Sequence, residues 1–401
     1  MNSKNIAIIG GGPSGLIAAE ILGKAGHSVT VYDRMPMPGR KLLMAGRGGL
    51  NLTHSEPLDK FITRYGEAAD WLAPYIRAFP PEALRAWCEG LGQETFIGSS
   101  GRVFPRSMKA APLLRAWLSR LESLGVRYAP RHSWQGFEGV ALRFTDAVGK
   151  TVIVQPDATL LALGGASWPR LGADGGWVDI LSEQGVEISP LRASNCGFVV
   201  PWSEYFSSHF AGTPLKPVAL SHNGVSQQGE VMITANGLEG GAIYALSASL
   251  RETIAVNGSA LLHLDLRPDM TQEALAQKLD IPRASKSLST YLRKAGLSPL
   301  AVALLREVTP EIPVTPAVLA ARLKALPITL TATTGLARAI STAGGITRGA
   351  LNEDFMLKAK PGVFAAGEML DWETPTGGYL LQACFSTAVA AATGMLEWVG
   401  G

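Results

Sequence analysis

Short apolar runs and one longer apolar stretch follow one another at the start of the chain. Residues 5–9 (NIAII) are almost entirely apolar, which is typical of a buried parallel strand. The Ala-, Leu- and Ile-rich residues 16–25 predict a helix that ends at Gly26, and residues 27–32 predict a second strand. This order of strand, helix and strand predicts a βαβ unit.

The turn between the first strand and the helix reads GxGxxG. Gly10 allows a tight turn, Gly12 lets the backbone approach a pyrophosphate, and Gly15 lets the helix pack closely on the strand. The free N–H groups of the helix N-terminus favour phosphate, and an acid at the end of the second strand can accept hydrogen bonds from a ribose. The sequence therefore predicts a dinucleotide site. Its predicted contacts are Gly10, Gly12, Pro13, Ser14, Gly15 and Asp33.

The C-terminal end of the chain predicts the second half of a flavin site. Residues 362–367 read as a short strand that leads into Glu368, where an acid meets the ribityl chain. Residues 380–398 predict a long apolar helix. The N-terminal amides of this helix would face the flavin C2 carbonyl and N1, where negative charge develops on reduction. These two segments favour FAD over NAD as the bound dinucleotide.

Other apolar runs fill the middle of the chain. Residues 159–163 predict a strand that leads into a glycine pair beneath the pyrophosphate. Between residues 190 and 265, short apolar stretches are separated by Gly, Asn and Pro, which predicts a β-rich region. Residues 271–326 predict short helices that are interrupted by prolines, with Thr271 as the first N-cap.

Composition changes this picture little. The chain has 401 residues, of which 47% are apolar and 17% are charged, and this suits a folded protein of two or three domains. The net charge of +3 does not by itself indicate nucleic-acid binding. The three cysteines lie far apart without a CxxC motif, so no redox dithiol or metal site is predicted and a reducing compartment is expected. With no signal peptide and no apolar run of membrane-spanning length, a cytoplasmic protein without membrane contact is expected.

Several motifs resemble those of one protein family. Residues 39–46 (GRKLLMAG) are similar to the GRKLLxSG signature of the BaiN/RdsA-type NAD(P)/FAD-dependent flavoproteins, also called the aminoacetone-oxidase-like family. The resemblance continues along most of the chain. Further matching blocks lie at residues 101–110 (GRVFPRSMKA), 163–169 (LGGASWP), 342–345 (TAGG), 364–371 (FAAGEMLD) and 376–382 (TGGYLLQ).

The resemblance implies an α/β fold in three parts. The first is a Rossmann-like, two-part FAD-binding domain formed by residues 1–189 and 336–401. An inserted β-barrel-like domain is expected at residues 190–270 and 327–335, with a small helical insertion at residues 271–326.

Two departures from the family pattern indicate a divergent branch. Where the family reads RCNxTN, residues 49–54 read GLNLTH, so that Leu50 replaces the cysteine and His54 the final asparagine, while Asn51 remains. A family histidine in a later block corresponds to Ala235. Both positions that could carry a proton donor near the flavin are therefore changed.

The loop after the second strand adds further site residues. Arg40 and Lys41 lie where a pyrophosphate or ribityl chain would pass. Arg34 either stacks on an adenine or helps to hold a phosphate, and the alternative is a solvated arginine at a strand end. The other predicted cofactor contacts are Leu42, Gly48, Asn51, Gly164, Gly165, Gly367, Glu368, Asp371, Gly377, Gly378, Tyr379 and Leu380.

The sequence leaves the catalytic residue unknown, and three polar residues are candidates. His54 is of the type most used in acid–base catalysis, although a histidine in a surface loop is the alternative interpretation. Asn51 shares its loop, and Tyr379 lies at the mouth of the C-terminal helix.

These features predict an FAD-dependent oxidoreductase that transfers a hydride between the flavin N5 and a substrate. The first interpretation is a reductase of an activated C=C bond, such as an enone or a uridine 5,6-bond, with a small molecule expected as the substrate. Because only one GxGxxG is present, its reductant NAD(P)H would reach the flavin transiently. An FAD-dependent amine oxidase is one alternative. Another is an rRNA-directed uridine reductase or a non-catalytic flavin- and RNA-binding protein, since residues 102–131 and 278–306 are rich in Lys and Arg.

Overall fold

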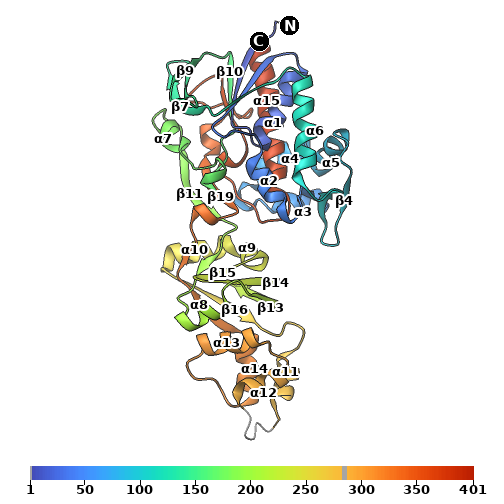
Figure 1. Cartoon of the computed structure of the whole chain (residues 1–401), viewed down its shortest axis with the longest axis vertical. Helices are drawn as coiled ribbons and strands as arrows, with labels where there is room; N and C mark the ends of the chain where they lie inside the picture. The colour runs from blue at the N-terminus through green and yellow to red at the C-terminus, as the bar shows by residue number, and fades with distance from the viewer. Residues whose placement is uncertain (1, 282–286) are drawn as a thin grey trace. The chain divides into compact units, whose positions relative to one another are not determined.

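The computed structural model describes residues 2–281 and 287–401. The chain divides into two compact units (Figure 1). Unit 1 comprises Met1–Arg192 and Ser341–Gly401, and unit 2 comprises Ala193–Ile340. The two ends of the chain therefore fold together, and the middle of the chain forms a unit of its own.

A five-stranded parallel sheet forms the centre of unit 1, with strand order β20-β10-β1-β2-β6. Strands β1 and β10 are buried almost throughout, as their continuous apolar runs predict. Strand β20 comes from the C-terminal segment and pairs with β10, so both ends of the chain contribute to one sheet. The Rossmann-like, two-part fold expected from the sequence is confirmed. The bounds are β1 Asn5–Ile9, β2 Ser28–Asp33, β6 Arg127–Pro130, β10 Ala158–Leu161 and β20 Val363–Ala365.

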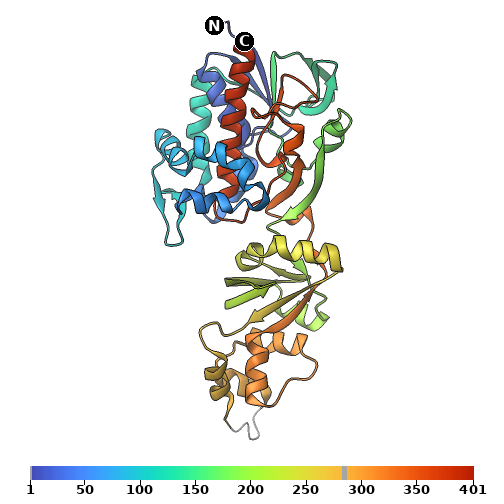
Figure 2. The same ribbon diagram turned by 180° about the vertical axis from the view of Figure 1, so that it is seen from behind.

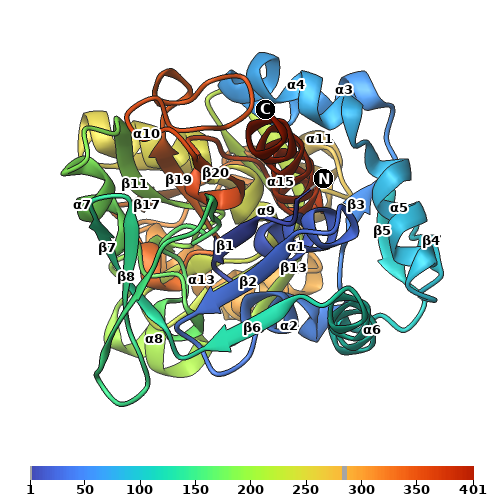
Figure 3. The ribbon, with the colours of Figure 1, turned by 90° about the horizontal axis from the view of Figure 1, so that it is seen from above.

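Two helices, α1 (Pro13–Lys24) and α15 (Tyr379–Gly400), lie side by side in unit 1 (Figures 1 and 3). The Ser14 hydroxyl at the start of α1 donates to the Cys384 carbonyl of α15 over 3.0 Å. The expectation that no segment matches a membrane span in length and apolarity is wrong for α15. However, 67% of its most apolar window is buried inside the protein, as in the core helix of a folded domain.

The remaining parts of unit 1 surround this core. A three-stranded antiparallel sheet, β3-β5-β4, contains Thr53–His54, Arg102–Pro105 and Thr95–Ile97. The residues around Asn51 were expected to form one polar loop, but Thr53 is fully buried in β3. The other elements are α2 Arg40–Ala45, α3 Leu58–Thr63, α4 Ala69–Ala78, α5 Pro81–Gly90, α6 Ala110–Ser123, β7 Ser133–Glu138, β8 Ala141–Thr145, β9 Thr151–Val154, α7 Trp177–Ser182, β11 Ile188–Ser194 and β19 Ser341–Ile346.

Unit 2 is built on a seven-stranded antiparallel sheet with strand order β17-β16-β13-β14-β15-β12-β18. Its first and last strands are separated in the chain only by Thr331, whose N–H donates to the Val199 carbonyl over 3.0 Å. The sheet therefore closes on itself, and the β-barrel-like architecture is confirmed. The bounds are β12 Phe198–Val199, β13 Pro214–His222, β14 Val225–Thr234, β15 Gly237–Glu239, β16 Ala260–Asp265, β17 Leu326–Leu330 and β18 Ala332–Thr333.

Helices complete unit 2 (Figure 2). The predicted N-cap is confirmed, since the Thr271 hydroxyl accepts from the Ala274 N–H over 3.2 Å. A separate helical domain at residues 271–326 stays a prediction, and part of the basic stretch 278–306 lies outside the described residues. The helices are α8 Glu204–Phe210, α9 Gly241–Ala245, α10 Ser247–Asn257, α11 Gln272–Leu279, α12 Leu288–Lys294, α13 Pro299–Val308 and α14 Pro316–Lys324.

Candidate functional site

The glycines of the first turn have different physical roles. A Cβ atom on Gly10 would approach the Ala162 carbonyl oxygen to 2.2 Å, and one on Gly15 would approach the Gly10 carbonyl oxygen to 2.0 Å. These two glycines are therefore required by the packing of α1 and β10 against the end of β1. A Cβ on Gly12 would meet no atom within 4 Å. The backbone at Gly12 borders open space in front of the N-terminus of α1, which is where a pyrophosphate is expected.

Asp33 ends β2 beside this turn. One of its carboxylate oxygens accepts from the Gly11 N–H and the other from the Met35 N–H, each over 2.7 Å. Burial raises the pKa of the Asp33 carboxyl above its usual range, against the opposing effect of these hydrogen bonds. Asp33 thus fixes the turn, and its contact with a ribose stays a prediction.

Two arginines near this turn have a buried Nε atom without a hydrogen-bond partner among the described residues, namely Arg34 and Arg40. The Arg34 guanidinium also pairs with Asp174 and donates to the Pro169 carbonyl over 3.1 Å. An unpartnered buried donor is costly, and an anionic ligand would satisfy it. The orphaned Nε of Arg40, which directly precedes the predicted ribityl contact Lys41, therefore fits a phosphate-bearing cofactor.

Lys41 and Glu368 form an ion pair over 2.7 Å, although 327 residues separate them in the chain. The Lys41 ammonium also donates to the Ser167 hydroxyl over 2.6 Å. The other Glu368 oxygen accepts from the Thr342 N–H over 3.1 Å. The structure thus brings together α2, the loop after β10, β19 and the segment after β20. Ser167 and Thr342 were missed as site residues, although both lie in sequence blocks that match the family.

Close backbone contacts hold this polar cluster in place. A Cβ on Gly367, which has φ +84°, would approach the Ser14 hydroxyl oxygen to 2.3 Å. A Cβ on Gly165 would approach the Thr342 hydroxyl oxygen to 2.3 Å. Both glycines are predicted site residues, and the structure shows that each allows two distant segments to touch.

For the other predicted cofactor contacts, the structure shows the position of each residue within the fold. The Asp371 carboxylate accepts from the Ser189 hydroxyl over 2.5 Å, so this hydrogen bond ties it to β11. Leu42 is buried in α2, and Gly48 ends a short 3-10 helix. Leu380 follows Tyr379 in the first turn of α15. Their contact with a cofactor stays a prediction, as does that of Pro13, Gly164 and Gly377.

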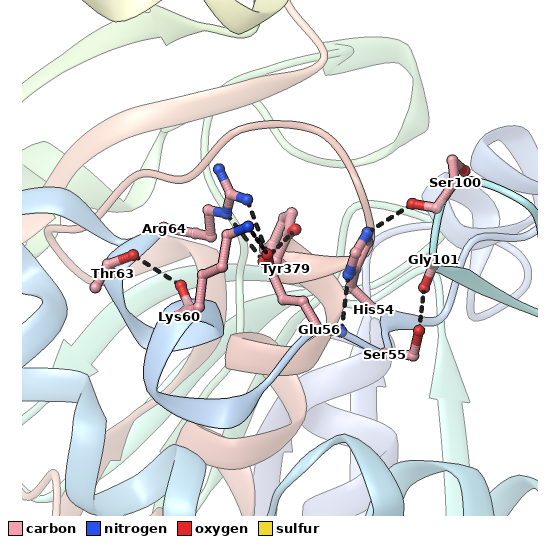
Figure 4. Close-up of polar contacts among 9 residues, drawn as sticks. All are labelled: His54, Ser55, Glu56, Lys60, Thr63, Arg64, Ser100, Gly101 and Tyr379. Atoms are coloured by element: carbon pink, nitrogen blue, oxygen red, sulfur yellow. Dashed lines mark hydrogen bonds and ion pairs between the residues drawn. The ribbon is translucent and has the colours of Figure 1, made fainter.

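The start of α15 is fixed by a second polar cluster, shown in Figure 4. The Tyr379 hydroxyl donates to a Glu56 carboxylate oxygen over 2.6 Å. Arg64 donates to both Glu56 oxygens, over 2.9 and 2.8 Å, and Lys60 lies 3.8 Å from the carboxylate. A Cβ on Gly378 would lie 2.6 Å from the backbone of β3, so α15 begins directly against that strand. Glu56 and Arg64 were not predicted.

The candidate catalytic residues are engaged in hydrogen bonds within the protein. The Nε2–H of His54 donates to the Ser100 carbonyl over 3.0 Å, and its Nδ1 accepts from the Glu56 N–H over 3.1 Å (Figure 4). The imidazole stacks on the Tyr379 ring at 5.5 Å between centroids. The amide nitrogen of Asn51 donates to two backbone carbonyls. These contacts position the segment around β3, and a catalytic role for any of the three stays a prediction.

The Glu56 cluster predicts a pH dependence of stability. The hydrogen bonds from Arg64 lower the pKa of the Glu56 carboxyl from 4.5 to about 2. Because the folded-state pKa is depressed, the stabilisation is present above the unfolded pKa of 4.5 and is lost as pH falls towards about 2. This lowering of the Glu56 pKa corresponds to at most about 3 kcal/mol in the free energy of unfolding. Solvent screening at the half-exposed Arg64 reduces that contribution to about 1–2 kcal/mol.

Replacing Glu56 by glutamine should therefore lower the free energy of unfolding at neutral pH and flatten its decline between pH 4.5 and about 2. Urea unfolding at a series of pH values measures both effects. Glu94→Gln is the matched control, since Glu94 pairs with Arg106 at the exposed surface and should change little. An equal pH profile for Glu56→Gln and the wild type would contradict the prediction.

Comparison with known proteins places this geometry in a family. The model of the HI0933-like protein Rossmann domain matches residues 4–394. A ribosomal RNA dihydrouridine synthase of Haemophilus influenzae is 27% identical, covering 97% of this chain and 98% of the relative. The protein of the same name from Escherichia coli is 26% identical, covering 97% of both chains.

Solved structures show the same fold at low sequence identity. The 3-ketosteroid Δ1-dehydrogenase from Sterolibacterium denitrificans superposes with a TM-score of 0.56 at 12% identity, covering 99% of this chain and all of that one. An open conformation of a flavocytochrome c3 fumarate reductase gives a TM-score of 0.55 at 13% identity, covering 99% and 78%. Because the family model matches nearly the whole length of this chain, the chain belongs to the HI0933-like (BaiN/RdsA-type) family of FAD-dependent oxidoreductases.

Proposed function

We propose that this protein reduces the C5–C6 double bond of uridine in ribosomal RNA. The observation that carries the proposal is the end-to-end match to two ribosomal RNA dihydrouridine synthases, which covers 97% of this chain in each case. Both units are therefore matched, and not the dinucleotide-binding part alone. This favours the RNA alternative over the small-molecule reductase that was the first interpretation of the sequence.

A match to a D-amino acid dehydrogenase of Dechloromonas aromatica does not support an amine oxidase. It is 32% identical but covers only 31% of either chain. A partial match of this kind says nothing of the part that selects a substrate.

The described residues fit FAD at the C-terminal edge of the parallel sheet. FAD, when bound, supplies hydride transfer at its N5. Gly12 and the N-terminus of α1 would bind the pyrophosphate, with Arg40 beside them. Lys41 and Glu368 would hold the ribityl chain, and the first amides of α15 would stabilise negative charge on the ring. Tyr379, through Glu56, keeps that helix end in place.

Reduction of uridine needs a hydride, which carries two electrons, and a separate proton. We propose a reduced nicotinamide nucleotide as the source of the hydride and solvent as the source of the proton. Uridine gains one hydride and one proton across C5–C6, and the nicotinamide is oxidised in return. Unit 2, as far as the structure describes it, is antiparallel and offers no parallel βαβ unit for a second dinucleotide. The nicotinamide nucleotide would then use the same substrate site in turn with the RNA.

The test uses the FAD-loaded protein and an unmodified rRNA transcript under anaerobic conditions, with NADH or NADPH. One of the two nucleotides should bleach the flavin absorbance, and RNA should restore it. Digestion and mass spectrometry should then show uridine that has gained two hydrogens. Omitting the nucleotide is the control. A flavin that the nucleotides reduce but that leaves every uridine unchanged would overturn the proposal. Rapid reoxidation of that reduced flavin once air is admitted would favour an oxidase.

A further inference from the structure

We infer that the β4–β5 hairpin of unit 1 is the surface that docks the RNA, an inference that rests on the proposed function. The docking hairpin is defined as residues 95–109, which comprise β4, a Gly/Ser turn, β5 and the turn before α6. It contains three basic residues and no Asp or Glu. Figure 1 shows the hairpin at the edge of unit 1, beside α5. A polyanion is the partner that such a surface fits.

The structure separates the basic residues of the stretch 102–131 into two groups. Three of them are held by other side chains, at 2.8–3.0 Å. These are Arg106 with Glu94, Arg120 with Glu20 and Arg127 with Ser28. The other four, Arg102, Lys109, Arg115 and Arg131, are exposed, and their side chains have no hydrogen bond or ion pair with any residue that the structure describes. Of these four, Arg102 and Lys109 belong to the docking hairpin. These two charges of the docking hairpin are therefore available to phosphates.

Apolar side chains share the docking hairpin with the free charges. Ile97 is 49% exposed and Met108 is 37% exposed. Phe96 and Phe104 are half-buried, with ring centroids 5.9 Å apart. Positive side chains interleaved with aromatic and apolar ones are typical of surfaces that bind single-stranded RNA, where bases stack and phosphates pair. The composition of the hairpin therefore favours an unpaired RNA segment.

The docking hairpin is joined directly to the candidate flavin site. Strand β5 pairs with β3, with Val103 opposite Thr53 and Arg102 opposite His54. The start of α15 packs on the backbone of Thr53. His54 also donates to the Ser100 carbonyl in the hairpin turn, as Figure 4 shows. An RNA segment held by Arg102 would thus lie next to the helix end that is predicted to meet the flavin ring.

His54, which stands where the family has an asparagine, connects the docking hairpin to the segment around Glu56. His54 joins the hairpin turn to the Tyr379–Glu56 cluster through its two ring nitrogens.

The test compares two double variants of the FAD-loaded full chain. Arg102→Gln with Lys109→Gln removes two charges from the docking hairpin. Arg143→Gln with Lys150→Gln removes two charges from exposed positions at the β7–β8–β9 sheet, as a matched control. Binding of a fluorescent, unmodified rRNA transcript is measured at several salt concentrations, and the flavin spectrum reports that the fold is intact.

The hairpin variant should bind RNA about tenfold more weakly, and the slope of log affinity against log salt should fall by about 1.4, for two lost phosphate contacts on single-stranded RNA. The control should bind as the wild type does. Unchanged binding by the hairpin variant, or an equal loss in both variants, would overturn the inference. Wild-type protein that binds no RNA overturns the proposed function as well. Wild-type protein that needs the hairpin to bind RNA but forms no dihydrouridine supports the docking surface and overturns the proposed reaction alone.

Discussion

A Gly12→Ala variant should fold as the wild type does and yet lose FAD. The backbone at Gly12 has φ −82° and ψ −179°, which alanine adopts without strain, and an added Cβ would meet no protein atom within 4 Å. The free energy of unfolding of the FAD-free protein should therefore stay the same. The methyl group would occupy the space in front of α1, where the pyrophosphate is expected. Crowding of this kind typically costs 1–3 kcal/mol, so we expect an FAD affinity about 100-fold weaker.

Gly15→Ala is the matched comparison, because it changes the same motif by the same single methyl group. Its Cβ would lie 2.0 Å from the Gly10 carbonyl oxygen and 3.1 Å from Ile8. Helix α1 would have to move away from β1, at a cost of about 3 kcal/mol in folding free energy. Urea unfolding of the FAD-free proteins and FAD titration by fluorescence separate the two effects. A Gly12→Ala protein that binds FAD normally would contradict the assignment of the pyrophosphate site.

The sequence predicts best those parts of the fold that depend on neighbouring residues. The apolar run of β1, the glycine turn and the acid at the end of β2 lie within about one βαβ length, and each has a local physical reason. Strand β20 could be recognised because a glycine and an acid follow it directly, and its partner β10 also ends in a glycine pair. These signals do not require knowledge of distant contacts.

The Glu56 cluster could not be predicted in this way. Tyr379 and Glu56 are 323 residues apart, and nothing in the pattern around Glu56 distinguishes it from any surface acid at the start of a helix. Strand β3 is also too short, at two residues, to show an alternating pattern. Its position is set by β5 and by the close packing of Gly378. The sequence therefore indicated a loop where the structure has a buried strand.

Leu50, at the position of the family cysteine, is a second residue whose contacts the sequence could not predict. Leu50 is fully buried, and its N–H donates to the Met108 carbonyl over 2.8 Å. The sequence showed that the cysteine was missing but could not show what the leucine does. In the structure Leu50 belongs to the apolar core of unit 1, so its side chain contributes packing.

The Lys41–Glu368 pair leads to an expectation that depends on which partner is removed. The Glu368 side chain is only 8% exposed, whereas that of Lys41 is 27% exposed. Lys41→Met would leave a buried carboxylate without its counterion, which should cost about 3 kcal/mol in unfolding free energy. Glu368→Gln would leave an ammonium group that can still reach water, so its cost should be smaller, about 1 kcal/mol. The less buried residue of the pair should therefore be the more damaging one to replace.

This asymmetry can be measured by urea unfolding of the FAD-free protein at neutral pH. The deficit of Lys41→Met relative to the wild type should exceed that of Glu368→Gln by about 2 kcal/mol, because only Lys41→Met leaves a buried charge without its partner. Lys60→Met is the control, because Lys60 is 65% exposed and Glu56 keeps its hydrogen bonds to Arg64. A Lys41→Met deficit that is no larger than that of Lys60→Met or of Glu368→Gln would show that the buried Glu368 carboxylate does not depend on Lys41 as its counterion.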